Sequence, residues 1–409
     1  MKAVILAAGL GRRMQSEEPK PLLPLFGMPI IEHTIRKLKG IDIIVVYHDE
    51  RIKKYIEKKF PDVKLIYNPE PDRENGWSLY LAKDFVNEDF LLLMADHYYG
   101  EEFFQFKKRR NTTVFVSKHC RDAEEATKVK VDGKKVVNIG KKLRKYDYFD
   151  TGFFYCKKDV FKYAEKLAEK GKMKLAEIMK ELAKEGKLEY EVVNASWTDI
   201  DTKKELKYAE ELVKKSLIKE GDGIISKNVN RKISMRITKH LLKFDFLTPN
   251  VLTIISFLIG IFSSALFMLK SFIFAGLMAQ FCSILDGCDG EIARLKNLKS
   301  KFGGILDAYL DRIADFLIIF GIFLAYGIDT ISSIAFLIAL LGCIMPSYIY
   351  HLSGIRSDLF GRDVRLFIVF IGGILATLNK EFLLYTLLFI GIYMNVGAIS
   401  FLLQARKKG

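Results

Sequence analysis

The sequence DGCDGEIARLKNLKSKFGGILDAYLD occupies residues 286–311 and lies between long apolar stretches. It carries four aspartates in two pairs, Asp286 with Asp289 and Asp307 with Asp311. Spacings of three and four residues place each pair on one face of a helix. Carboxylates at the edge of membrane helices are costly unless they meet cations or line a polar cavity. Four converging carboxylates therefore indicate a hard divalent metal ion, with Mg²⁺ expected and Mn²⁺ as the alternative.

Small residues and one arginine accompany these acids. Gly290 follows Asp289 directly, Ala293 and Arg294 come one turn later, and Gly303 stands one turn before Asp307. The complete pattern resembles the signature of the CDP-alcohol phosphatidyltransferase family of integral membrane enzymes. By this resemblance, the chain would transfer a phosphoryl group from a CDP-linked donor to an alcohol and release CMP. The alternative, solvated aspartates in salt bridges at helix ends, leaves the matching small residues unexplained.

This resemblance also implies a role for each residue of the motif. It implies that Asp286, Asp289 and Asp307 bind the metal with help from Asp311, which would also be the general base for the acceptor hydroxyl. Small residues would let the nucleotide approach the helix backbone closely. The implied CDP-binding residues are Gly290, Ala293, Arg294 and Gly303.

Length and composition predict two domains. The chain has 409 residues, a net charge of +15, a first part rich in Lys and Glu, and a second part of long apolar runs. We expect domains at residues 1–220 and 248–409, joined at 221–247 by a linker and an amphipathic juxtamembrane helix. Many basic residues flank the apolar runs, which indicates contact with membrane lipid and not with nucleic acid. The five cysteines form no CxxC pair, so we expect reduced thiols without a zinc site.

Apolar length predicts an all-α membrane domain with six spans. We expect the spans at residues 249–269, 272–294, 302–327, 331–352, 365–378 and 382–403. Lysine and arginine gather at alternate turns, while the opposite turns carry only Lys270 and Lys380. By the positive-inside rule, both termini, the soluble domain and all four aspartates lie at the cytoplasmic face of the cell membrane.

The chain begins with an apolar run at residues 2–6, which is typical of a strand buried on both faces. The loop AAGLGRRMQSEEPKPL follows at residues 7–22. A glycine loop after a strand offers backbone N–H groups to phosphates, and Arg12, Arg13 and Lys20 can neutralise a triphosphate. A dinucleotide-binding fingerprint fits less well, because Met14 stands where its third glycine belongs.

LAAGLGRRM followed by PKPL resembles the sugar-nucleotidyltransferase family. The resemblance implies that Arg13 and Lys20 are catalytic. Arg12 stands where the family usually has Thr or Ser, which leaves its role open; a basic surface loop is the alternative interpretation. The implied nucleotide-binding residues are Ala7, Ala8, Gly9, Gly11, Arg12, Arg13 and Lys20.

Strands and helices then alternate, as in an α/β Rossmann-like domain. We expect strands at residues 43–46, 64–67 and 90–94, helices at 30–38, 52–58 and 77–85, and a hairpin with an Asp-Gly turn at 129–137. The loop PEPDRENG, residues 69–76, is expected to border the nucleotide. Asp96 follows the last of these strands, at the sheet edge where open α/β sheets bind ligands.

The nucleotidyltransferase resemblance implies further site residues. It implies metal binding by Asp96 and Asp199, with a structural cap as the alternative for Asp96. Asp201 is expected to be the N-cap of the helix that follows it. Lys141, Asp150 and Gly152 would line a sugar-phosphate pocket, although Gly140 stands where the family has Glu.

The two motif sets together resemble a family of bifunctional enzymes that fuse an inositol-1-phosphate cytidylyltransferase to a di-myo-inositol phosphate phosphate synthase. The resemblance implies CTP and inositol 1-phosphate as substrates, CDP-inositol as the intermediate, a precursor of a thermophile's compatible solute as the product, and a homodimer. One or more of Arg356, Arg362 and Arg365 is expected to bind the acceptor phosphate, with positive-inside anchoring as the alternative.

Other function classes remain open at this point. One is a phospholipid synthase that uses a CDP-lipid donor and carries an independent nucleotidyltransferase domain. Another is an ion-coupled transporter with a regulatory soluble domain, although the acids gather at one membrane face. A catalytically dead scaffold is a third interpretation of the soluble half, which the intact Arg13, Lys20, Asp96 and Asp199 oppose.

Overall fold

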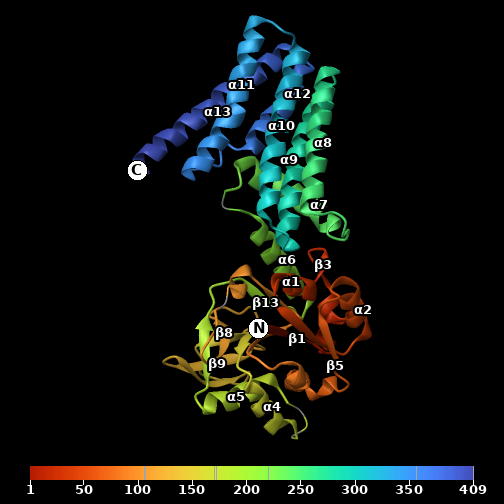
Figure 1. The fold of residues 1–409 in the computed structure, drawn as a ribbon, viewed down its shortest axis with the longest axis vertical. Helices are drawn as coiled ribbons and strands as arrows, with labels where there is room; N and C mark the ends of the chain where they lie inside the picture. Colours follow the sequence, from red (N-terminus) through yellow and green to blue (C-terminus); the bar gives the residue numbers. More distant parts are fainter. Residues whose placement is uncertain (106, 170, 172, 220, 356, 409) are drawn as a thin grey trace. The chain divides into compact units, whose positions relative to one another are not determined.

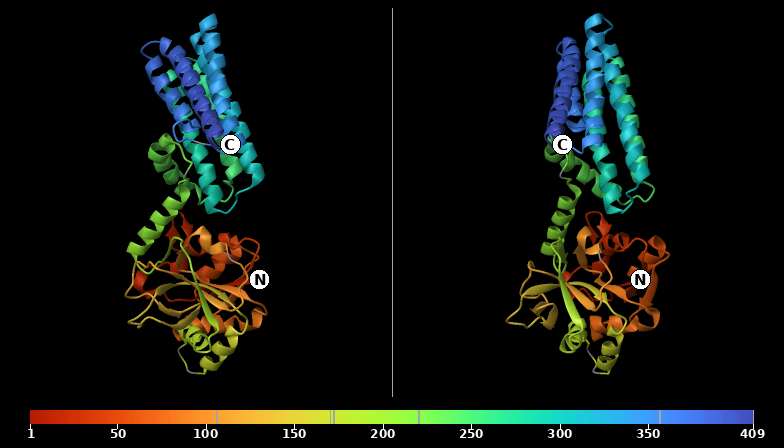
Figure 2. Two further views of the ribbon diagram at one scale, coloured as in Figure 1. Left: turned by 90° about the vertical axis from the view of Figure 1, so that its left-hand side faces the viewer. Right: turned by 60° about the vertical axis from the view of Figure 1, so that its left-hand side comes forward.

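The structure is a computed structural model that describes residues 1–409 apart from residues 106, 170, 172, 220, 356 and 409, and without the side chains of 407 and 408. Contacts within the chain divide it into two units, Met1–Lys215 and Ser216–Gly409 (Figures 1 and 2). Each unit has its own buried core.

Four parallel strands form one end of the sheet in the first unit. They are β1 (Lys2–Ala7), β4 (Asp42–Tyr47), β5 (Lys64–Tyr67) and β6 (Phe90–Met94), in the order β5-β4-β1-β6. All four strands predicted from their apolar runs are confirmed. The chain moves from β1 to one side and later returns to place β6 on the other, so a crevice opens at the carboxyl ends of β1 and β6.

The other end of the sheet closes on itself. β6 pairs with β11 (Tyr148–Cys156), and the order continues through β8 (Thr112–Ser117), β12 (Leu188–Val192), β10 (Lys135–Gly140) and β9 (Lys128–Asp132). Because β9 also pairs with β11, these five strands form a closed ring. β9 and β10 form the predicted hairpin, and Gly133 of its Asp-Gly turn has a φ of +55°.

Helices cover both faces of the sheet. α1 (Ile30–Lys37) and α2 (Glu50–Lys59) pack on one face, and α3 (Asn75–Leu81), α4 (Val160–Ala168) and α5 (Leu175–Lys184) pack on the other. The helix predicted at residues 77–85 begins earlier, at Asn75, whose Oδ1 accepts a hydrogen bond from the N–H of Leu175 at 2.8 Å. It ends at Leu81 and is followed by a 3₁₀ turn, Lys83–Phe85.

Six helices form the bundle of the second unit (Figures 1 and 2). They are α8 (Pro249–Met268), α9 (Phe272–Leu295), α10 (Lys301–Tyr326), α11 (Thr330–Ser353), α12 (Arg362–Ala376) and α13 (Glu381–Lys408). In the described part of the chain, α8, α9, α11 and residues 381–406 of α13 are long and apolar enough to cross a membrane. α10 carries several charged side chains and α12 has only 15 residues, so these two predicted spans do not qualify by length and composition alone.

A shorter helical segment precedes the bundle. After α6 (Lys203–Leu217), a π-helical turn, Ser226–Asn230, leads into α7 (Arg231–Leu241). The buried side of α7 is mostly polar, whereas an amphipathic helix usually buries an apolar side. Arg231, Ser234 and Thr238 on this side donate hydrogen bonds to Glu291 of α9. The segment predicted as a juxtamembrane helix thus contains a helix, and that helix packs against α9; its position on a membrane surface stays a prediction.

Candidate active sites

The loop after β1 lines a cavity of about 450 Å³ in the first unit. Gly11 has a φ of +59°, and a Cβ built on it would lie 3.3 Å from Cβ of Lys20, so the turn favours glycine. The loop PEPDRENG borders the same cavity through Pro71, Asp72 and Glu74. All seven predicted nucleotide-binding residues of the loop line this cavity: Ala7, Ala8, Gly9, Gly11, Arg12, Arg13 and Lys20.

Lys20 lies buried beneath this cavity, between two carboxylates. Its Nζ donates to Asp96 Oδ2 at 2.6 Å and to Asp201 Oδ1 at 2.5 Å. Burial alone would lower the pKa of Lys20, but Asp96 and Asp201 outweigh it and raise the pKa above its ordinary value. Lys20 and His97 likewise hold the pKa of Asp96 well below its usual range.

Asp201 is a site residue that the sequence interpretation assigned wrongly. Its Oδ2 lies 2.6 Å from Arg13 Nη2, so it links the two basic residues predicted to contact phosphates. The cap of α6 is formed instead by Thr202 and Glu205, since Glu205 accepts hydrogen bonds from the N–H groups of Asp201 and Thr202 at 2.7 Å. The spacing Thr-x-x-Glu is a capping-box signal that could have identified this arrangement.

A second cavity of about 700 Å³ shares Arg13, Asp96 and Asp201 with the first. Lys141, Asp150 and Gly152, the predicted sugar-phosphate residues, all line it. A Cβ on Gly152 would lie 3.0 Å from His97 Nε2, and Gly152 has a φ of +74°, so glycine is required on both grounds. Burial raises the pKa of Asp150 to about 6, although its carboxylate accepts a hydrogen bond from the N–H of Gly152.

The predicted metal ligands Asp96 and Asp199 line this second cavity and flank one imidazole. The ribbon of β7 (His97–Tyr99) and β13 (Trp197–Asp199) places Asp199 opposite His97, and His97 Nδ1 lies 2.8 Å from Asp96 Oδ1. Burial raises the pKa of Asp199. Two carboxylates on one polar cavity fit a hard cation such as Mg²⁺. His97 is a neighbouring site residue that the sequence motifs did not indicate.

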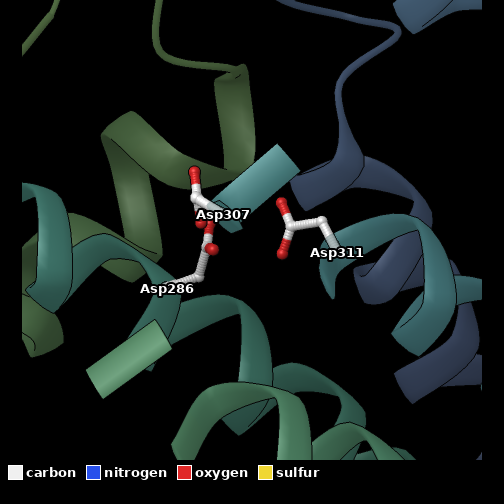
Figure 3. Close-up of side chains that lie close together, drawn as sticks. All are labelled: Asp286, Asp307 and Asp311. Carbon is white, nitrogen blue, oxygen red and sulfur yellow. The ribbon is translucent and has the colours of Figure 1, made fainter. Parts of the chain in front are cut away.

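In the second unit, three of the four predicted aspartates come together (Figure 3). Oxygens of Asp286 on α9 and of Asp307 and Asp311 on α10 lie within 4.8 Å of one another. Oδ1 of Asp307 is buried and has no hydrogen-bond partner among the described residues. Converging oxygen ligands with an unpaired buried oxygen fit a divalent metal such as Mg²⁺ or Mn²⁺.

Asp289 lies outside this group of three, although it borders the same cavity of about 530 Å³. It is buried, and its Oδ2 accepts a hydrogen bond from the Thr253 hydroxyl at 2.5 Å. Of the predicted CDP-binding residues, Gly290 lines the cavity. Ala293, Arg294 and Gly303 lie outside its wall; Arg294 donates to the carbonyl oxygen of Leu217, and Gly303 packs against Asn250.

Two of the three arginines predicted to bind acceptor phosphate, Arg362 and Arg365, lie in the first turn of α12. Nη1 of Arg362 is 2.7 Å from Asp311 Oδ1 and 3.3 Å from Asp286 Oδ1. Arg365 is buried and pairs with Asp315. Arg356 lies outside the described residues.

Two buried acids of this unit were missed by the sequence interpretation. Asp315 continues the row of Asp307 and Asp311 along α10 and accepts a hydrogen bond from Nε of Arg362 at 3.0 Å. Glu291, inside the opening motif, is fully buried and accepts hydrogen bonds from α7. The spacing of four from Asp311 to Asp315 was a signal for the first.

The fold and the two sites define a nucleotidyltransferase-like domain joined to a CDP-alcohol phosphotransferase domain. The family model of the MobA-like NTP transferase domain matches residues 3–135, and that of CDP-alcohol phosphatidyltransferase matches residues 246–401.

Three curated relatives share both domains, and each is named "Bifunctional IPC transferase and DIPP synthase". The relative from Archaeoglobus fulgidus is 38% identical, over 95% of this chain and 81% of its own. Those from Thermococcus kodakarensis and Rubrobacter xylanophilus are 40% and 32% identical, over 85% and 91% of this chain and 81% and 90% of their own. The chain belongs to this family of bifunctional IPC transferases and DIPP synthases.

Proposed function

We propose that the first unit condenses CTP with inositol 1-phosphate to give CDP-inositol and pyrophosphate. The second unit then transfers the inositol-phosphoryl group of CDP-inositol to a second inositol 1-phosphate, giving phosphorylated di-myo-inositol phosphate and CMP. The observation that carries the proposal is that each unit of the chain has an acid-lined cavity. The cavity of about 450 Å³ in the first unit and that of about 530 Å³ in the second are bordered by residues of different nucleotide motifs. The similarity to bifunctional relatives along nearly the whole chain supports it.

In the first reaction, a phosphate oxygen of inositol 1-phosphate attacks the α-phosphate of CTP, and the bond to the leaving pyrophosphate breaks. The attacking phosphate is already ionised, so no general base is required. Arg13, Lys20 and the loop N–H groups neutralise the charge that develops on the phosphates. Asp96 and Asp199 would hold a divalent cation, which supplies further neutralisation of that charge.

The wall that the two cavities of the first unit share supports this assignment of the first reaction. Arg13, Asp96 and Asp201 border both, so a triphosphate on one side and a sugar phosphate on the other would meet at these residues. Lys141, Asp150 and Gly152 then lie on the sugar-phosphate side.

In the second reaction, Asp311 removes the proton from the acceptor hydroxyl. The hydroxyl oxygen attacks the phosphorus next to inositol, and the bond from that phosphorus to CMP breaks. Asp286, Asp289, Asp307 and Asp311 would hold Mg²⁺, which supplies charge neutralisation on the diphosphate. Arg362 borders the same cavity beside Asp311, which supports it as the arginine that contacts the acceptor phosphate.

All six helices of the bundle cross the cell membrane in this proposal, with both sites at the cytoplasmic face. The charges of α10 support this, because they belong to the site and not to a lipid-facing surface. The lysines and arginines at alternate turns support the orientation. A homodimer in contact with membrane lipid remains our prediction for the assembly.

A substrate screen on the detergent-purified protein tests the proposal. We expect pyrophosphate from CTP only with inositol 1-phosphate, followed by CMP without added lipid. Pyrophosphate with a different sugar phosphate would contradict the choice of inositol while keeping the two reactions. CMP that appears only with a CDP-lipid would assign the second unit to phospholipid synthesis, and neither product would favour a transporter.

A further inference from the structure

One wall of the cavity in the second unit comes from outside the recognised phosphotransferase domain. Lys219, Asp222, Gly223 and Arg231 line it together with Asp286 and Gly290. The first four precede residue 246, where the match to the CDP-alcohol phosphatidyltransferase model begins. The segment before the bundle is therefore part of this site.

The ammonium group of Lys219 lies close to Gly290, a residue of the predicted CDP-binding motif. A Cβ built on Gly290 would lie 3.4 Å from Nη1 of Arg294 and 4.0 Å from Nζ of Lys219. Both cations therefore lie beside Gly290, a position of α9 without a side chain. A glycine between two cations is suited to a phosphate group that approaches the helix closely.

Neither cation is neutralised by a carboxylate of its own. Lys219 and Arg294 form no ion pair among the described residues, and Nε of Arg294 is buried without a hydrogen-bond partner. Desolvation and the neighbouring Arg294 and Arg231 lower the pKa of Lys219, while Asp222 and Asp286 oppose this effect. Lys219 is exposed and Arg294 is half-buried, so an anion that enters the cavity can reach Lys219 and relieve the repulsion between the two like charges.

A buried network holds Lys219 in this place. Asp222 accepts hydrogen bonds from the N–H of Lys219 at 3.1 Å and from Nε of Arg231 at 2.8 Å. Arg231 also donates to Glu291 at 2.8 Å, and Glu291 follows Gly290 directly on α9. The turn that carries Lys219 is thus tied to the helix that carries Gly290.

We propose that Lys219 is a further donor-binding residue of the second site and that it contacts the diphosphate of the CDP-linked donor where that group approaches Gly290. This inference rests on the proposed function, because it takes the donor to be CDP-inositol. It adds to the site a residue that the phosphotransferase motif does not contain.

Steady-state kinetics of CMP release test the inference in the full chain supplied with CDP-inositol and inositol 1-phosphate. For Lys219→Ala we expect about a tenfold rise in the KM for CDP-inositol and in the inhibition constant of CDP, the loss of one charge-assisted contact. The kcat and the KM for inositol 1-phosphate should change less than about twofold. Lys219→Arg should restore the wild-type KM, and Lys219→Glu should raise it further.

Lys232→Ala is the matched control, since Lys232 is an exposed lysine of α7 outside the cavity wall. Equal KM values for CDP-inositol in Lys219→Ala and Lys232→Ala would overturn the inference, as would a change confined to the acceptor. If the wild-type protein releases no CMP from CDP-inositol, the proposed function fails. Calorimetric binding of CDP to wild type, Lys219→Ala and Lys232→Ala then decides the role of Lys219 separately.

Discussion

The site in the first unit and the site in the second unit hold their carboxylates in different ways. In the first unit each carboxylate at the cavity floor faces a cation, since Lys20 lies between Asp96 and Asp201, and Arg13 contacts Asp201. In the second unit, Asp286, Asp307 and Asp311 crowd together, and Arg362 reaches only two of them. Charge is therefore nearly balanced within the protein at the first site, whereas the group of Asp286, Asp307 and Asp311 in the second retains an excess of negative charge.

This difference indicates which of the two sites depends more on a bound metal for its structure. A crowded group of carboxylates repels itself until a cation separates the charges, so bound metal contributes to structure as well as to chemistry there. Where each acid has a basic partner, loss of a metal leaves the protein geometry supported.

The largest effect is expected for Asp307→Asn in the crowded group. Removing one metal ligand should reduce CMP release by about a thousandfold, because the charge on the diphosphate is no longer neutralised. Pyrophosphate release from CTP should stay unchanged in the same preparation. Added Mg²⁺ should also raise the unfolding temperature of the wild-type bundle and no longer do so for the variant.

Asp329→Asn is the control for this substitution. Asp329 caps α11 away from the cavity, and asparagine caps helices equally well, so both reactions should proceed normally. An Asp307→Asn protein that still releases CMP at the wild-type rate would contradict a metal at this group.

Lys20→Ala tests the paired arrangement in the first unit. We expect pyrophosphate release to fall by about a hundredfold, because Asp96 and Asp201 lose their shared cation and the triphosphate loses a contact. CMP release from supplied CDP-inositol should be unaffected. Lys39→Ala, at an exposed lysine, is the control, and loss of both reactions in folded Lys20→Ala protein would refute two independent sites.

Arg231→Leu addresses the buried charges that support the second site. Asp222 and Glu291 would be left without their common partner, at a cost of about 3–5 kcal/mol in the free energy of unfolding. Far-UV circular dichroism in detergent should record the lower unfolding temperature. Lys232→Leu makes the same change at an exposed neighbour and should be nearly neutral; equal stability of the two variants would show that the network contributes nothing.

The smallest effect concerns pH and Asp150 in the first unit. Burial raises the pKa of this carboxyl to about 6, so the folded state holds the proton more tightly than the unfolded state does. The resulting stabilisation, about 3 kcal/mol, is complete below about pH 4 and disappears as the pH rises through 6. Trp77 and Trp197 both lie in the first unit, so tryptophan fluorescence can follow its unfolding selectively.

Asp150→Asn should remove this pH dependence, because the amide does not titrate. Asp132→Asn, at an exposed aspartate of the hairpin, should keep it. Equal pH dependence of the wild type and Asp150→Asn between pH 4 and 7 would show that Asp150 is ionised throughout that range.

The sequence predicted what depends on local pattern. Apolar runs located the strands β1, β4, β5 and β6, and the Asp-Gly pair located the hairpin of β9 and β10. Motif spacing gathered Asp286, Asp307 and Asp311 correctly, since helical periodicity places them on facing sides of α9 and α10.

Partners that are distant in sequence could not be predicted in this way. Arg231 and Glu291 are 60 residues apart, and Arg362 and Asp315 are 47 apart, so no local pattern announces either pair. The structure also shows why charge weakens the apolar signal of one predicted span. α10 follows the predicted boundaries closely, yet its acids belong to the site and lower its apolar character.

The closed ring of β11, β8, β12, β10 and β9 has a consequence for self-association. Unpaired strand edges are templates on which other chains add strands and aggregate. Because the ring joins β9 back to β11, β5 is the one strand of the nine-stranded sheet that has a neighbour on a single side among the described residues, although β10 and β12 share only the pair Lys135 and Glu189. Strand β5 has only four residues and begins with an exposed lysine, Lys64, two features that discourage intermolecular pairing. These features favour a first unit that resists strand-mediated aggregation while the apolar bundle, which follows it in the chain, is still being synthesised.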